Sequence, residues 1–144
     1  MISKQVHTGV LVVDDDRATR DTIRIVFQYE GYMVFEAADG RSALDVLAVS
    51  RSRLIVLLDW LLPDLDGIRV MQQHALAATT PSAVHRSRPR PHTFILLTGS
   101  NKSVADLPPG MSVSVLKKPF DLSYLLALVR AAAAHGGAGE LGER

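Results

Sequence analysis

The stretch Leu54-Ile55-Val56-Leu57-Leu58-Asp59 decides the fold of this chain. Apolar residues follow one another without interruption and are succeeded at once by an acidic one. A continuous apolar run is typical of a strand that is covered on both faces of a parallel sheet. The carboxyl ends of such strands are where open parallel sheets place their ligand sites. The stretch therefore predicts a buried strand and makes Asp59 a candidate functional residue.

Further apolar runs of strand length lie on both sides of this stretch. They are Val10–Val13, Tyr32–Phe35, Phe94–Leu97 and the weaker Val113–Leu116. Segments of helical period separate the runs, and a last one follows them with its apolar residues on one stripe: Leu122, Leu125, Leu126, Val129, Ala132 and Ala133. Alternating strands and helices predict an α/β fold, a doubly wound parallel sheet with right-handed crossovers and helices on both faces.

Two segments interrupt the alternation. Thr79–Pro91 carries three Pro and three Arg, which predicts that the third helix ends before it and that an extended, mobile loop follows. The usual place of a fourth helix holds only Lys102–Leu107 before a Pro-Pro pair, so we expect that helix to be short or missing. Residues 9–134 are expected to form one domain, and residues 135–144 a flexible Gly-rich tail. No second domain or repeat is apparent.

The composition is that of a single globular domain. The chain has 144 residues, of which 47% are hydrophobic and 22% charged, and no apolar run approaches the ~18 residues of a membrane span. The segment Met1–Gly9 has no apolar core of a secretion signal, so we expect a cytoplasmic protein without membrane contact. The absence of Cys excludes disulfides and thiolate sites. A net charge of +1 provides no general attraction for nucleic acid, and direct nucleic-acid binding is not expected.

Polar residues concentrate where the predicted strands end: Asp14 and Asp15, Asp59, Thr98 and Lys118. In a doubly wound sheet these ends converge, which would create an acidic pocket. Two unit charges about 4 Å apart repel by ~4 kcal/mol at an effective dielectric of 20, so the pocket needs a counter-charge. Carboxylate oxygens suit Mg²⁺, and Lys118 supplies a second positive charge.

Such a pocket suits phosphoryl transfer to a carboxylate. The metal and Lys118 would stabilise charge on the phosphoryl oxygens while Asp59 attacks in line. Phosphorylation would add roughly −1.5 to −2 charge, and the Thr98 hydroxyl could then move inward to bind the new oxygens. That motion would be a switch.

Four motifs in this order resemble the receiver domains of two-component response regulators, those of chemotaxis regulators included. They are Val12-Val13-Asp14-Asp15, the stretch from Leu58 to Gly67, Leu97-Thr98-Gly99 and Lys118-Pro119-Phe120. The resemblance covers roughly residues 9–133, nearly the whole chain. It implies a flavodoxin-like (βα)5 fold with strand order 2-1-3-4-5.

The resemblance also implies roles for individual residues. Asp59 would be the phosphoacceptor, Asp14 and Asp15 would hold Mg²⁺ together with Asp59 and the backbone carbonyl of Leu61, and Thr98 and Lys118 would contact the phosphoryl group. The peptide bond before Pro119 would be cis. The phosphoryl group would come from a histidine kinase or phosphotransfer protein, and a protein effector would recognise the phosphorylated state. The chain would be its own substrate rather than a conventional enzyme, and homodimer formation is left open.

The sequence departs from this family where the signal is usually transmitted. Val115 stands where the family usually has Tyr or Phe, and the Gly-Ala that commonly opens the fifth strand is replaced by a nearby Gly110-Met111. These departures keep open a binding module that works without phosphorylation. A haloacid-dehalogenase-like phosphatase is a further alternative, with its Asp-x-Asp signature on Asp14–Asp16. It fits poorly, because Ala18 stands where Thr or Val is expected and no acidic pair follows the lysine.

Other polar residues are interpreted as structural. Asp16 is a predicted N-cap, Asp64 and Asp66 belong to a turn and are assigned no catalytic role, and Lys117 should face solvent. Trp60 is expected to be a partly exposed lid. The histidines show no metal-ligand spacing and are predicted at the surface: His7, His74, His85, His92 and His135.

Overall fold

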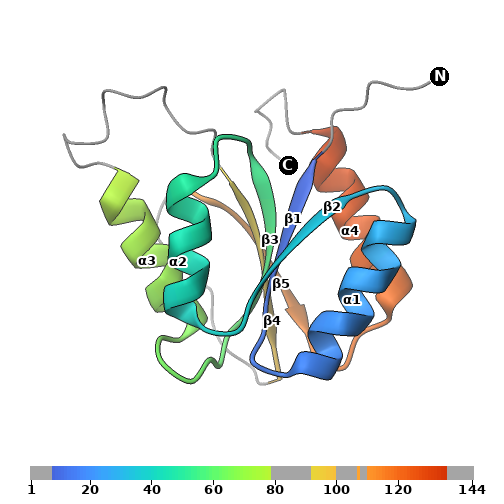
Figure 1. Ribbon diagram of the computed structural model, residues 1–144, viewed down its shortest axis with the longest axis horizontal. Helices are drawn as coiled ribbons and strands as arrows, with labels where there is room; N and C mark the ends of the chain where they lie inside the picture. Colours follow the sequence, from blue (N-terminus) through green and yellow to red (C-terminus); the bar gives the residue numbers. More distant parts are fainter. Residues whose placement is uncertain (1–7, 79–91, 100–106, 108–109, 136–144) are drawn as a thin grey trace.

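The computed structural model describes residues 8–78, 92–99, 107 and 110–135. Strands and helices alternate along the chain (Figure 1): β1 Gly9–Val13, α1 Arg17–Tyr29, β2 Met33–Ala37, α2 Gly40–Val49, β3 Leu54–Asp59, α3 Gly67–Ala78, β4 Thr93–Thr98, β5 Ser112–Lys117 and α4 Leu122–Ala134. The loop predicted at 79–91 lies outside the described residues. So do the tail at 136–144 and, except for Leu107, the segment of the short fourth helix.

The strands form one sheet in the order β2-β1-β3-β4-β5, and every pair of neighbours is parallel. This confirms the α/β fold and the strand order that the resemblance implied. The register pairs Val13 with Leu58 and Asp59 with Leu97. The residues at the carboxyl ends of β1, β3 and β4 therefore lie side by side at one edge of the sheet.

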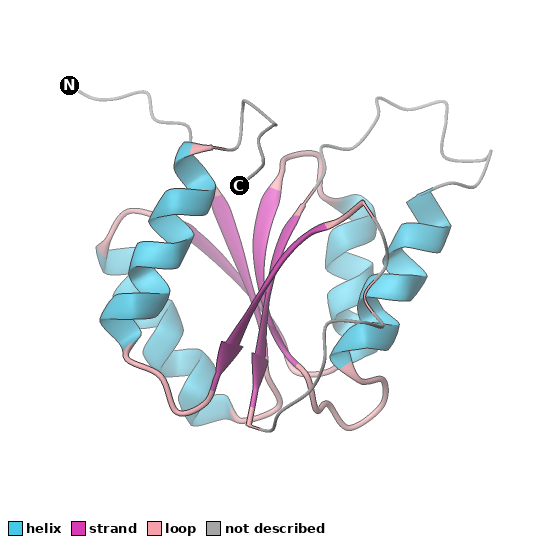
Figure 2. Ribbon diagram, turned by 180° about the vertical axis from the view of Figure 1, so that it is seen from behind, coloured by secondary structure: helices cyan, strands magenta, loops and turns pink. Residues whose placement is uncertain are grey.

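Helices cover both faces of the sheet (Figures 1 and 2). α1 and α4 pack on one face, and α2 and α3 on the other. Successive strand residues point to opposite faces, so Val10 and Val12 join the α1/α4 cluster whereas Leu11 and Val13 join the α2/α3 cluster. Because both faces are covered, all residues of β1 and β3 are buried, which is why their sequences are apolar without interruption over Val10–Val13 and Leu54–Leu58.

The edge strand β2 begins one position later than the predicted Tyr32–Phe35 run and continues to Ala37. Gly31, with φ 97°, turns the chain at the end of α1. The Tyr32 ring then packs 5.6 Å from the ring of Phe27, measured between centroids, and belongs to the helix–sheet junction. β2 lies at the edge of the described sheet, and most of its residues are exposed or half-exposed.

Side chains cap the first two helices. Asp16 is the N-cap of α1, as predicted, and accepts a hydrogen bond from the Thr19 backbone N–H. Asp39 is the N-cap of α2 and accepts from the Ser42 N–H at 2.8 Å. Each cap follows directly on a strand or its short loop, so the chain enters each helix at the carboxyl edge of the sheet. In the ranges described, no helix has the length and apolarity that crossing a membrane requires.

Two predictions about exposure are wrong. Trp60 is 6% exposed and packs in the α2/α3 cluster, because its backbone N–H continues the ladder to the Leu97 carbonyl and carries the side chain inward. His92 is 4% exposed and accepts a hydrogen bond from the Leu54 N–H. His74 is half-buried beside it. Of the other histidines, His135 is exposed as predicted, and positions 7 and 85 lie outside the described residues.

Candidate functional site

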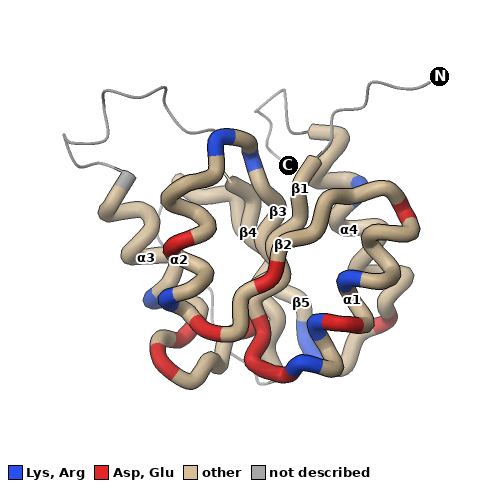
Figure 3. The backbone as a smooth tube through the Cα atoms, viewed as in Figure 1, with Lys and Arg blue, Asp and Glu red and all other residues tan. Residues whose placement is uncertain are grey.

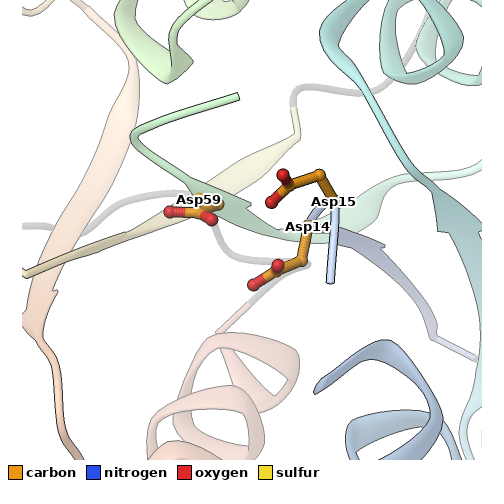
Figure 4. Close-up of side chains that lie close together, drawn as sticks. All are labelled: Asp14, Asp15 and Asp59. Atoms are coloured by element: carbon orange, nitrogen blue, oxygen red, sulfur yellow. The ribbon is translucent and has the colours of Figure 1, made fainter. Parts of the chain in front are cut away.

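Three carboxylates meet at the carboxyl edge of the sheet (Figure 4). Asp14 and Asp15 follow β1, and Asp59 ends the neighbouring β3. One carboxylate oxygen from each residue lies within 4.8 Å of the others. Asp14 and Asp59 are buried, whereas Asp15 is exposed. The carboxylate cluster is therefore accessible to solvent on the side of Asp15.

The position of Asp14 is held by several hydrogen bonds. Its backbone N–H donates to the Ala37 carbonyl at 3.1 Å, and its Oδ1 accepts from the Asp16 N–H at 2.9 Å. Its carbonyl accepts from the Arg20 guanidinium at 2.8 Å. Asp14 Oδ2 is buried without a hydrogen-bond partner among the described residues. The remaining oxygen is thus aimed at a site that a cation could fill.

Lys118 brings a positive charge to this pocket from the end of β5. Its Nζ lies 3.4 Å from Asp59 Oδ1 and 3.7 Å from Asp14 Oδ2. The Lys118 backbone N–H donates to the Thr98 carbonyl at 2.7 Å, which ties the lysine to the end of β4. The Lys118–Pro119 peptide bond is cis, as the resemblance implied. Lys117 is exposed, as predicted.

The surroundings of Asp59 oppose its negative charge. Burial raises the pKa of its carboxyl above the ordinary value, the Lys118 ammonium lowers it, and the Asp14 carboxylate raises it again. The Leu61 N–H also donates to Asp59 Oδ1, at 3.3 Å, and favours the ionised form. The net pKa is raised, so one lysine does not fully compensate for burial and for the neighbouring carboxylate.

Two further predicted site residues occupy suitable places in the chain. Thr98 is buried at the end of β4, one position beyond the Leu97 that pairs with Asp59. Leu61 lies in the loop after β3, and its side chain is exposed. The contact of Thr98 with a phosphoryl group and that of the Leu61 carbonyl with a metal stay predictions.

The β3–α3 loop, residues 60–66, is anchored at both ends. The Trp60 carbonyl accepts from the Gly67 N–H at 2.7 Å, and a Cβ at Gly67 would lie 3.0 Å from the Asp59 carbonyl oxygen. Asp66 accepts from the Arg69 N–H at 2.9 Å in the first turn of α3. Asp64 accepts from the Gly40 and Arg41 N–H groups, at 2.7 Å and 2.9 Å. Both carboxylates therefore bind backbone, as expected for a structural turn.

One supporting residue was missed by the sequence reasoning. Arg20 on α1 binds the Asp14 carbonyl and also lies 3.2 Å from Glu36 of β2. It belongs to a helix with many charged residues, so nothing in the sequence distinguishes it from a solvent-facing arginine. Figure 3 shows acidic residues gathered along the carboxyl edge of the sheet, with Lys and Arg residues among them.

The donor set fits a hard divalent cation. All three groups are carboxylates, which are typical Mg²⁺ ligands, and their oxygens are close enough to share one ion. Asp14 Oδ2 accepts no hydrogen bond from the described residues, and the pKa of Asp59 is raised; both indicate negative charge that Lys118 balances only in part. Asp14, Asp15 and Asp59 could therefore hold a metal.

The sequence matches the family model described as "Response regulator receiver domain" over residues 10–130. The chain belongs to this family. The receiver domain is 38% identical over 125 residues to response regulator MprA of Mycolicibacterium vanbaalenii, a match that covers 85% of this chain and 48% of that protein. Response regulator MprA of Mycobacterium avium is also 38% identical, with 85% and 49% covered. The chain thus spans about half the length of these curated relatives.

Solved receiver domains share the fold. The crystal structure of a CheY-like response regulator receiver domain protein from Methanospirillum hungatei has a TM-score of 0.73 at 23% identity, covering 94% of this chain and 100% of that one. Chemotaxis response regulator CheY4 of Vibrio cholerae has a TM-score of 0.65 at 25% identity, covering 88% and 98%. The chain is therefore a receiver domain of the two-component signalling type in both sequence family and fold.

Proposed function

We propose that this receiver domain is a phosphorylation switch whose acceptor is Asp59. One observation carries the proposal: the Lys118 ammonium lies within 4 Å of both Asp59 and Asp14, in a pocket where three carboxylates converge. A buried acidic site with its own fixed cation is suited to receive a phosphoryl group, because transfer depends mainly on positioning and on neutralising charge. The exposed Asp15 side leaves room for a donor to approach.

The transfer is a nucleophilic displacement at phosphorus. An Asp59 carboxylate oxygen attacks the phosphorus of a phosphohistidine on a histidine kinase or phosphotransfer protein. The O–P bond forms while the N–P bond breaks, and the electron pair leaves with the imidazole nitrogen, which takes up a proton. Lys118 stabilises the charge on the phosphoryl oxygens.

Mg²⁺ would be held by Asp14, Asp15 and Asp59 together with the Leu61 carbonyl. When bound, it supplies charge neutralisation for the carboxylates and the phosphoryl group. Thr98, buried at the end of β4, supplies a hydroxyl that reorients toward the modified Asp59. An effector protein of unidentified chemistry then distinguishes the two states, and the chain acts as a switch rather than as a conventional enzyme.

Intact-mass spectrometry after incubation with acetyl phosphate and Mg²⁺ tests the proposal. We expect one adduct of about 80 Da on the wild type and none on Asp59→Asn. Asp45→Asn, an exposed carboxylate on α2, is the matched control and should form the adduct normally. The adduct should disappear when EDTA removes the metal. An adduct on Asp59→Asn, or none on the wild type with acetyl phosphate or phosphoramidate, would contradict the switch.

A second candidate is a binding module that acts without phosphorylation. Val115, in the position where receiver domains usually carry an aromatic ring, is half-buried and packs against the α2/α3 cluster. It has no ring that could change rotamer when Thr98 moves. Equal partner affinity of the wild type and Asp59→Asn, under phosphorylating conditions, would favour this candidate over the switch.

A further inference from the structure

The carboxylate of Asp64 connects the loop after the acceptor strand to a helix that lies elsewhere in the sequence. Its Oδ1 accepts from the N–H groups of Gly40 and Leu65, at 2.7 Å and 2.8 Å, and its Oδ2 accepts from the Arg41 N–H at 2.9 Å. Gly40 and Arg41 are the first residues of α2. Asp64 is thus bonded both to its own loop and to a neighbouring element.

This contact is separate from the local cap of α2. Asp39 already caps that helix through the Ser42 N–H. Asp64 accepts from the N–H groups of Gly40 and Arg41, which precede Ser42 and are not bonded by the Asp39 side chain. Burial raises the pKa of the Asp64 carboxyl, but the bonds from Gly40, Arg41 and Leu65 outweigh it and the net pKa is lowered. The ionised form therefore makes the contact at neutral pH.

The packing at Gly40 shows how closely the loop approaches α2. A Cβ added at Gly40 would lie 2.9 Å from the Leu65 Cβ and 3.2 Å from Asp64 Oδ1. Any larger residue would push the loop away from the helix. The loop between Trp60 and Gly67 is therefore held at its two ends by backbone bonds and in its middle by Asp64.

We propose that Asp64 is a positioning residue for the metal and phosphoryl site, through the backbone of Leu61. The inference rests on the proposed function, since Leu61 is the loop residue expected to offer its carbonyl to Mg²⁺. The Leu61 N–H already bonds Asp59 Oδ1, so the orientation of this peptide affects the acceptor directly. Clamping residues 64 and 65 to α2 leaves the intervening loop few alternative conformations, which preorganises the carbonyl.

The test compares Asp64→Ala with Asp39→Ala in the full chain, using Mg²⁺ titration by calorimetry and Tm measured without metal. Both variants lose N-terminal hydrogen bonds of α2 and should lower Tm to a similar extent. Only Asp64→Ala should weaken Mg²⁺ binding, by about tenfold or more, as loss of a supporting partner does at other metal sites. The milder Asp64→Asn, which keeps an acceptor for Gly40, should fall between Asp64→Ala and the wild type.

The outcomes separate this inference from the proposed function. Equal Mg²⁺ affinities of Asp64→Ala and Asp39→Ala would overturn the positioning role and leave Asp64 a helix cap. Wild-type Mg²⁺ binding without a phosphoryl adduct would contradict the switch, while the comparison of affinities would still decide the role of Asp64. A wild type that binds no Mg²⁺ would overturn both.

Discussion

At the scale of single residues, Asp59 is held in a surrounding that disfavours its charge. The carboxylate is 11% exposed and has Asp14 as a close neighbour, and the Lys118 ammonium and the Leu61 N–H counter these effects only in part. A carboxyl whose pKa is higher in the folded than in the unfolded state destabilises the fold above that pKa. The penalty disappears as the pH falls and the group becomes protonated. At neutral pH, the apo protein is less stable because this site carries charge.

The substitution Asp59→Asn should therefore raise Tm at pH 7 in the absence of Mg²⁺. It removes one of three crowded carboxylates and leaves Lys118 paired with Asp14. Thermal melts of the wild type and the variant should converge as the pH falls through the raised pKa of Asp59, because the wild-type carboxyl then becomes neutral. A lower Tm for Asp59→Asn across this range would show that its charge is already well compensated.

Lys118 should affect metal binding and phosphorylation in opposite directions. Replacing it by Met removes a cation 3.4 Å from Asp59, so Mg²⁺ affinity should rise about fivefold, or ~1 kcal/mol. The rate of adduct formation should fall, since the phosphoryl oxygens lose their fixed cation. Calorimetry and intact mass measure the two effects, with Lys117→Met as the exposed control. Weaker Mg²⁺ binding by Lys118→Met would mean that the lysine organises the pocket rather than competing with the metal.

At the scale of elements, a histidine joins β3 and β4 at the end opposite to the acidic pocket. His92 Nδ1 accepts from the Leu54 N–H at 2.9 Å, so its neutral form carries the proton on Nε2. Burial, His74 and Arg53 together lower the His92 pKa to about 4. Protonation of His92 would place its Nδ1–H against the Leu54 N–H, so that two donors face each other. The hydrogen bond therefore depends on a neutral His92 ring.

Stability should fall below pH 6.5 because of His92. The unfolded chain takes up a proton near 6.5 and the folded chain only near 4, so the contribution is complete above 6.5 and is lost across this interval. The loss should reach about 3 kcal/mol. Urea unfolding of the wild type at pH 7.5 and 5 should show about 2 kcal/mol of this loss, because pH 5 still lies above the folded-state pKa.

The variant His92→Asn offers a matched control. Its Oδ1 can accept from the Leu54 N–H without titrating, so its stability should vary less between pH 7.5 and 5 than that of the wild type. His74 remains in the variant, and burial lowers its pKa too, so a smaller dependence should persist. The same pH dependence in both proteins would assign the acid sensitivity to other groups.

At the scale of the whole molecule, the residues of the site are bonded to, or packed in, the core of the domain. Trp60 follows the acceptor, donates its backbone N–H to β4 and packs in the α2/α3 cluster. Asp14 similarly continues β1 and is bonded through Arg20 to α1. A ligand that binds this site therefore contacts residues that are connected to helices on both faces of the sheet.

Mg²⁺ should stabilise the molecule as one cooperative unit. At a concentration of 100 times its Kd it should add about 2.7 kcal/mol to the free energy of unfolding, or roughly 10 °C in Tm. Melts followed by far-UV circular dichroism and by Trp60 fluorescence should shift together, and EDTA should reverse both. A shift confined to the fluorescence would indicate a local change around the loop.

Much of the fold could be predicted from the pattern of apolar residues. Fully covered strands must be continuously apolar, so β1, β3 and β4 were evident as runs, and four ordered motifs implied the strand order. The bounds of β2 were less accurate, because an edge strand is only partly buried and its pattern is weak. Asp14, Asp15, Asp59, Thr98 and Lys118 could be proposed as site residues because each directly follows or ends a strand.

Contacts between distant segments are visible only in the folded chain. Composition and motif place Trp60 and His92 on the surface, yet both are buried, since burial depends on which elements happen to pack over a position. Asp64 bonds to α2 residues that lie far away in sequence. Arg20 bonds to the nearby Asp14 carbonyl, but in the sequence it looks like any solvent-facing arginine of its helix. The helices, the strands and the residues at their ends could be predicted from sequence alone, because they follow local periodicity. Which side chains support that site depends on three-dimensional packing, and no local pattern records it.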